Sequence, residues 1–123
     1  MLPRILIADD ERLATMALQM FLSDEGYEVR TATSAENTVR EGRSFRPDLL
    51  MVDYLLGPGD RGTDVARTLR NDLHDLKVLV MTGLPADELD SIKDLREYTV
   101  LYKPLDLEQV ARSVAQLVGG GHE

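Results

Sequence analysis

The hydrophobic residues of this chain follow two different spacings. Short, mainly apolar runs at 5–8, 49–52, 77–81 (which opens with Lys77) and 100–102 are bounded by turn residues, which is typical of strands buried on both faces. A more polar run at 27–32 predicts a further strand near a sheet edge. Between the runs, apolar positions recur every three or four residues, as they do on amphipathic helices. Strand and helix therefore alternate five times, which predicts a parallel sheet with helices on both faces.

The number of strand–helix units narrows the fold class. Five such units favour an α/β, flavodoxin-like, doubly wound sheet of five parallel strands in the order 2-1-3-4-5 with five helices. A chain of 123 residues is long enough to bury roughly two-thirds of its unfolded surface in one core. We expect a single domain over 1–123, with its core at about 4–118 and a flexible tail at 119–123.

The predicted helices differ in how clearly they mark their buried face. In the first helix, which is expected to end at Gly26, the inward stripe is predicted to include Met16 and Met20 as core-filling side chains. A second helix is capped by Ser34, and a fourth begins at about Pro85. The last helix has the cleanest apolar stripe and is capped by Asp106. The predicted inward positions are Leu13, Met16, Ala17, Met20 and Phe21; Ala35, Thr38, Val39 and Gly42; Val65, Ala66 and Leu69; Leu89, Ile92 and Leu95; and Leu107, Val110, Ala111, Val114, Leu117 and Val118.

Charge and composition exclude several classes of function. The formal net charge is −8, so the chain offers no basic face for a nucleic-acid backbone, and we expect no nucleic-acid partner. There is no cysteine, which rules out a disulfide framework and a thiolate metal site. The apolar runs are far too short to span a membrane. We therefore expect a cytoplasmic protein with no membrane contact. Met1 lies so close to the first strand that a native start is favoured.

Polar residues collect where the predicted strands end. Asp9 and Asp10 follow the first strand, Asp53 the third, Thr82 the fourth and Lys103 the fifth. Because the carboxyl ends of parallel strands share one edge of a sheet, these residues can meet in one pocket. Three neighbouring carboxylates repel unless a cation compensates, and oxygen ligands favour Mg²⁺ or Mn²⁺. The set fits phosphoryl chemistry, with a carboxylate as acceptor and the cation and lysine stabilising charge.

These positions, in this order, resemble the receiver domain of two-component response regulators from about Arg4 to Val118. The resemblance implies that Asp53 accepts a phosphoryl group from a histidine kinase or a histidine phosphotransfer protein. It implies that Asp10, Asp53 and the backbone carbonyl of Leu55 bind Mg²⁺, while Asp9 supports the metal's water shell. Thr82 and Lys103 would contact the phosphoryl group. The Lys103–Pro104 bond resembles the family's cis peptide bond.

The chain departs from the family pattern in the loop after the acceptor. The family usually has a proline four residues and a glycine eight residues after the aspartate. Here Pro58 is five and Gly62 nine residues after Asp53, so the loop carries one extra residue, assigned to Gly57. Leu55 still follows Asp53 by two residues, so the predicted metal ligand is retained.

Two further departures concern switching and hydrolysis. The family's aromatic switch residue, three positions before the lysine, is replaced by Val100, and Tyr102 shares its face of the strand. We hypothesise that Tyr102 partly replaces the switch, or that the output uses none. Leu55 and Leu84 stand where the family's residues flank the hydrolytic water. Because both are bulky and apolar, we expect slow self-dephosphorylation.

Several functions are compatible with these residues. The leading interpretation is a stand-alone regulator or phosphorelay intermediate, not an enzyme in its own right. Its output would pass to a protein partner, or to a second copy in a homodimer, through the fourth helix, fifth strand and fifth helix. The alternative is a receiver-fold interaction module that acts without phosphorylation. An aspartyl phosphatase of the haloacid dehalogenase type does not fit the residues from Asp9 to Leu13. The G-x-G-x-x-G pattern at 57–62 does not favour nucleotide binding, because it follows the wrong strand.

Overall fold

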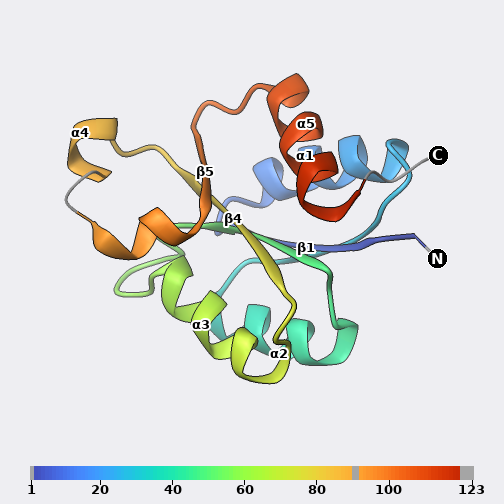
Figure 1. Cartoon of the computed structure of the whole chain (residues 1–123), viewed down its shortest axis with the longest axis horizontal. Coiled ribbons are helices and arrows are strands. Elements are labelled where there is room, and N and C mark those ends of the chain that lie inside the picture. The colour runs from blue at the N-terminus through green and yellow to red at the C-terminus, as the bar shows by residue number, and fades with distance from the viewer. Residues whose placement is uncertain (1, 90–91, 120–123) are drawn as a thin grey trace.

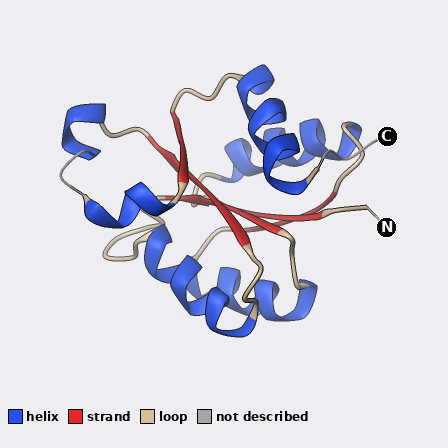
Figure 2. Cartoon of the chain, in the orientation of Figure 1, coloured by secondary structure: helices blue, strands red, loops and turns tan. Residues whose placement is uncertain are grey.

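The architecture is a five-stranded parallel sheet between two layers of helices (Figures 1 and 2). The computed structural model describes residues 2–89 and 92–119. The strand order is β2-β1-β3-β4-β5, so the predicted doubly wound fold is confirmed. The strands are β1 (Arg4–Ala8), β2 (Glu28–Ala32), β3 (Leu49–Asp53), β4 (Lys77–Thr82) and β5 (Thr99–Tyr102). The helices are α1 (Arg12–Asp24), α2 (Ala35–Phe45), α3 (Gly62–Asp72), α4 (Ala86–Leu89), a 3₁₀ helix (Lys93–Glu97) and α5 (Leu107–Val118).

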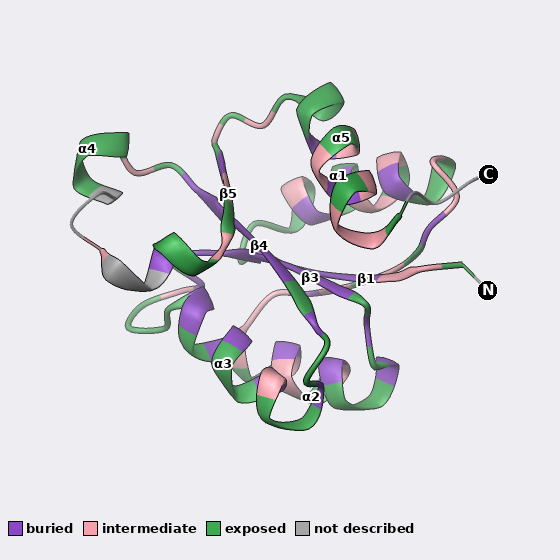
Figure 3. Ribbon diagram, viewed as in Figure 1, coloured by how far each residue is buried: buried purple, intermediate pink, exposed green. Residues whose placement is uncertain are grey.

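The core consists of two separate apolar clusters. Figure 3 shows that the central strands are largely buried between the two helical layers. Alternate residues of the central strands point to opposite faces, so β3 sends Leu50 and Val52 into one cluster and Leu49 and Met51 into the other. The first cluster lies under α2 and α3, and the second lies under α1 and α5. All five residues of β3 are buried, which explains why its sequence is an unbroken apolar run until Asp53.

Most predicted inward faces are confirmed. Thr38 and Gly42 of α2 and Val65, Ala66 and Leu69 of α3 are buried. β2 is an edge strand, as its polarity indicated. The Ser34 side chain accepts a hydrogen bond from the backbone N–H of Asn37, as expected of an N-cap. Asp106 also caps its helix and accepts from the N–H of Glu108.

The predicted inward face of α1 is wrong except at Phe21, which packs against the second cluster. The buried residues of this helix are Thr15, Leu18 and Leu22. Leu13, Met16 and Met20 are 81%, 54% and 68% exposed and lie on the opposite side of the helix. Met16 and Met20 therefore do not fill the core. Leu107, predicted to face inward from α5, is also 45% exposed.

The segment after β4 differs from the single helix that was predicted. α4 spans one turn at Ala86–Leu89, and the chain resumes as the 3₁₀ helix at Lys93–Glu97. Residues 90–91 in the middle of the predicted helix lie outside the described residues, as do 120–123 of the predicted tail. Leu95 is buried and Ile92 packs against the first cluster, so both still contribute to the core.

Candidate functional site

The register of the sheet brings the predicted site residues to one level. Ala8 pairs with Val52, so Asp9 and Asp53 follow at the same edge, and the backbone N–H of Lys103 donates to the carbonyl of Thr82 at 2.7 Å. Side-chain alternation then sorts these residues by face. Asp9, Asp53 and Lys103 share the parity of the cluster under α1 and α5. Residues from the first, third and fifth strands therefore converge at one side of the sheet end.

Lys103 joins two carboxylates. Its Nζ lies 2.9 Å from Asp9 Oδ2 and 2.9 Å from Asp53 Oδ2. Asp9 is 1% exposed and its other oxygen accepts the backbone N–H of Glu11. The Lys103–Pro104 peptide bond is cis, as predicted. The ammonium group thus balances part of a negative charge that is otherwise buried.

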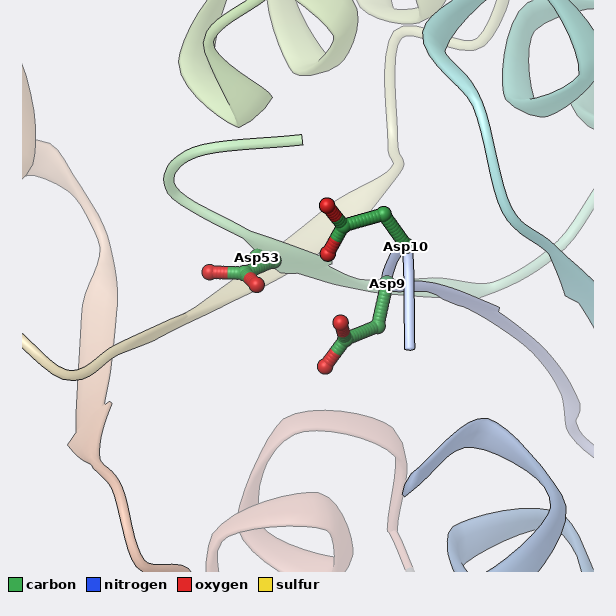
Figure 4. Close-up of side chains that lie close together, drawn as sticks. All are labelled: Asp9, Asp10 and Asp53. Carbon is green, nitrogen blue, oxygen red and sulfur yellow. The ribbon is translucent and has the colours of Figure 1, made fainter. Parts of the chain in front are cut away.

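A third carboxylate completes an acidic cluster (Figure 4). One oxygen each from Asp9, Asp10 and Asp53 lie within 4.8 Å of one another, and their side chains project from neighbouring strand ends. Asp10 is exposed, whereas Asp9 and Asp53 are buried. Carboxylate oxygens at this separation, with no histidine or cysteine among them, match the ligand chemistry of a hard divalent cation.

Burial and neighbouring charges shift the pKa values of Asp53 and Lys103. Burial raises the pKa of Asp53, and the nearby Asp9 charge adds to the effect. Lys103 and the backbone N–H of Leu55 act in the opposite direction by hydrogen bonding to the carboxylate. Burial by itself would lower the pKa of Lys103, but hydrogen bonds to Asp9 and Asp53 outweigh it, so this pKa is raised. A cation bound beside Asp53 would favour the ionised, nucleophilic form.

The other predicted residues differ in burial and in the face of the sheet they occupy. The Leu55 side chain is 51% exposed. Thr82 is buried and its hydroxyl accepts the backbone N–H of Leu84 at 3.0 Å. Thr82 is paired with Tyr102 in the sheet, and Val100 packs against the cluster under α2 and α3. Thr82, Val100 and Tyr102 thus share the face opposite Lys103, as strand parity predicts.

The exposed surface of α1 carries apolar side chains that the helical spacing predicted to be buried. Leu13, Met16 and Met20 form an exposed row on α1, which we call the α1 stripe. A cleft of about 270 Å³ lies between α1 and the start of α5, and its lining includes Ala17 and Leu107. Asp9 and Lys103 also line this cleft. The signal for this surface was present in the sequence as a second apolar side of α1.

A family model for the response regulator receiver domain matches residues 5–115. The chain belongs to this family. Its curated relatives include TcrX of Mycobacterium tuberculosis, a probable transcriptional regulatory protein, with 31% identity over 93% of this chain and 49% of the relative. MprA of Mycobacterium ulcerans, a response regulator, is 33% identical over 94% of this chain and 50% of its own length. The receiver therefore spans about half the length of these relatives.

Solved receiver structures share the fold. The response regulator TrrA of Thermotoga maritima, determined in complex with Mg²⁺–BeF, has a TM-score of 0.82 and 27% identity, covering 94% of this chain and 99% of its own. A receiver domain from Clostridium thermocellum gives a TM-score of 0.83 at 24% identity, covering 96% and 95%. Within the described residues, no helix of this receiver has the length and apolarity to cross a bilayer.

Proposed function

We propose that this receiver accepts a phosphoryl group on Asp53 from a histidine kinase or a histidine phosphotransfer protein. The observation that carries the proposal is the Lys103 ammonium group held 2.9 Å from the Asp53 carboxylate, with Asp9 and Asp10 beside it. Phosphoryl transfer needs positioned positive charge around a nucleophilic oxygen, and this arrangement supplies it. The Mg²⁺–BeF complex of TrrA supports the same role for the acidic cluster.

Mg²⁺ or Mn²⁺ would be held by Asp10, Asp53 and the backbone carbonyl of Leu55, with Asp9 beside its water shell. The ion would neutralise negative charge on the phosphoryl oxygens. An Asp53 oxygen attacks the phosphorus of the phosphohistidine as the phosphorus–nitrogen bond breaks, and the imidazole leaves with the bonding pair. Lys103 then donates to a phosphoryl oxygen, and the Thr82 hydroxyl donates to another. The product is an acyl phosphate on Asp53.

We assign different surfaces of the receiver to the phosphoryl donor and to the downstream partner. The α1 stripe begins at Leu13, three residues after Asp10, so we expect a donor that reaches Asp53 to cover it. Burying large exposed apolar side chains is favourable by about 25 cal/mol per Å² of apolar area. We assign the downstream protein contact, or a homodimer contact, to the face formed by α4, β5 and α5, where Tyr102 is 46% exposed.

The proposed activity is that of a switch with a long-lived signal. Leu55 and Leu84, two residues after Asp53 and Thr82, have no polar group that could orient a hydrolytic water, so the acyl phosphate is expected to hydrolyse slowly. A cytoplasmic location fits such a switch. Some relatives are named as transcriptional regulators, and this chain aligns with half of them, so the absence of nucleic-acid contact remains a prediction for these 123 residues.

A phosphorylation-independent interaction module remains the second candidate, because Val100 replaces the usual aromatic switch residue. Incubation with acetyl phosphate and Mg²⁺, followed by intact-mass measurement, separates the two. The switch predicts a gain of one phosphoryl group that disappears in Asp53→Asn and without Mg²⁺. Asp48→Asn is the matched control and should be labelled like the wild type. An unlabelled wild type would favour the module.

A further inference from the structure

The loop between β3 and α3 is closed by a short antiparallel bridge between Leu55 and Arg61. The backbone N–H of Leu56 donates to Asp60 O at 2.9 Å, and that of Gly62 donates to Tyr54 O at 2.7 Å. The closed turn lies beyond these two bonds. Gly57, to which the extra residue of this loop was assigned, therefore lies at the tip of a small hairpin.

The bond pattern of the bridge sets the direction of the Leu55 backbone. In an antiparallel pair, opposed residues either exchange both hydrogen bonds or are flanked by bonds of their neighbours. The two bonds here flank the pair, so Leu55 and Arg61 do not bond to each other. The N–H and carbonyl of Leu55 are thus directed away from Arg61. The N–H meets the Asp53 carboxylate, and the carbonyl of an extended residue points to the same side.

Two glycines make the tip possible. Gly57 and Gly59 have φ angles of 100° and 80°, a region that side chains with a Cβ rarely adopt. A Cβ placed on either glycine would meet no atom within 4 Å. Substitution at these positions therefore strains the turn without displacing a neighbour. They offer a means of opening the hairpin while leaving the rest of the site untouched.

We propose that the Gly57–Gly59 hairpin tip is a positioning element that holds the Leu55 carbonyl in a cation-binding orientation before any cation arrives. The proposal rests on the proposed function, since it concerns the same acidic site. Because the binding-competent backbone is already formed, the cation does not have to order the loop when it binds. The apparent affinity for the ion is then the intrinsic affinity multiplied by the fraction of molecules whose loop is closed.

The test compares cation binding by the wild type and the double variant G57V/G59V. The probe is Mn²⁺, whose free ion is followed by electron paramagnetic resonance, with Mg²⁺ added as competitor. We expect the dissociation constant to rise about tenfold in the double variant. The matched control is G119V, because Gly119 has a φ angle of 82° but caps the distant end of α5. Its dissociation constant should stay within about twofold of wild type.

A positioning role also predicts that acetyl-phosphate labelling of G57V/G59V recovers the wild-type rate at saturating metal. Equal Mn²⁺ affinity in the wild type and G57V/G59V would overturn the proposal while leaving the proposed function intact. If the wild type bound no Mn²⁺, or if Asp10→Asn bound it equally well, the metal site itself would fail and this proposal with it.

Hydrogen exchange gives a second test that needs no substitution. The amides of Leu56 and Gly62 should be protected in the metal-free wild type, because both already donate hydrogen bonds. Protection that develops only after metal is added would show that the ion builds the hairpin, and would overturn the proposal. This measurement decides the matter even if G57V/G59V does not fold.

Discussion

Replacing Lys103 by methionine should destabilise the metal-free protein, and Mg²⁺ should restore most of the loss. Methionine keeps the length and the apolar stem of the side chain while removing the ammonium group. Asp9, which is 1% exposed, and Asp53 would then share a buried site without their cation. Breaking a buried pair in this way costs about 3–5 kcal/mol. Because the Lys103 side chain is 27% exposed, water compensates part of the loss, and we expect about 2 kcal/mol.

The assay is urea unfolding followed by circular dichroism, first with a chelator and then with excess Mg²⁺. A ligand at about 100 times its Kd stabilises the folded state by about 2.7 kcal/mol. The wild type should gain less than Lys103→Met, because the ion neutralises carboxylates that the lysine already compensates. The matched control is Arg112→Met, which breaks an exposed pair with Glu108 and should change stability by less than about 0.5 kcal/mol.

The dependence of stability on pH gives an independent test of the same prediction. The folded-state pKa of Lys103 is raised, so its contribution to stability is present below the ordinary value of 10.5 and is lost as pH rises through the folded value. The folded-state pKa of Asp53 is also raised, so ionisation of Asp53 costs stability as pH rises through that value. The deficit of Lys103→Met should therefore shrink on acidification. A deficit that is independent of both pH and Mg²⁺ would refute this account of the site.

Three further predictions concern neighbouring residues. Gly62→Ala should lower the free energy of unfolding in urea by about 2 kcal/mol, because the added methyl group would overlap the carbonyl of Asp53. In the control Gly83→Ala the methyl group meets no atom within 4 Å, so stability should hardly change. Equal losses in the two variants would contradict this explanation. The double variant Met16→Gln/Met20→Gln should change the free energy of unfolding by less than about 0.5 kcal/mol. It should slow phosphoryl transfer from a histidine donor but not from acetyl phosphate. A large loss of stability would mean that these side chains are buried. Leu84→Glu should shorten the phosphoryl lifetime by about tenfold or more, and an unchanged lifetime would remove the apolar explanation for slow hydrolysis.

The strands and the composition of the site could be predicted because both follow from local patterns. A strand such as β3 is buried on both faces, so its sequence is a continuous apolar run that ends at Asp53. A parallel sheet places the ends of such runs at one edge. The convergence of Asp9, Asp53 and Lys103 therefore required only the strand assignments and their parity.

The orientation of α1 could not be predicted from spacing, because both sides of this helix are apolar. Leu18 and Leu22 face the core, while Leu13, Met16 and Met20 face outward with the same helical spacing. Periodicity finds an apolar stripe but does not say which of two stripes packs on the sheet. Thr15, a buried polar residue whose hydroxyl donates to the carbonyl of Arg12, also disguised the inner face.

The sequence also did not predict the contacts of Lys103 or the closed conformation of the loop after β3. The lysine was expected to meet a phosphoryl group, and in the structure its ammonium group contacts Asp9 as well as Asp53. The extra loop residue left the loop conformation open. The backbone hydrogen bonds of Leu56 and Gly62 show that the loop folds into a hairpin and that the Leu55 backbone groups point away from Arg61.

The measurement that tests the central claim most directly is the identification of the phosphorylated residue. Receiver labelled by a phosphohistidine donor is reduced with borohydride, which converts an aspartyl phosphate to homoserine, and then digested with trypsin. The peptide covering 44–61 contains Asp48, Asp53 and Asp60, so the label can be assigned within one fragment. The account predicts homoserine at 53 and unmodified aspartate at 48 and 60. Labelling at another residue, or transfer that persists in Asp53→Asn, would contradict it.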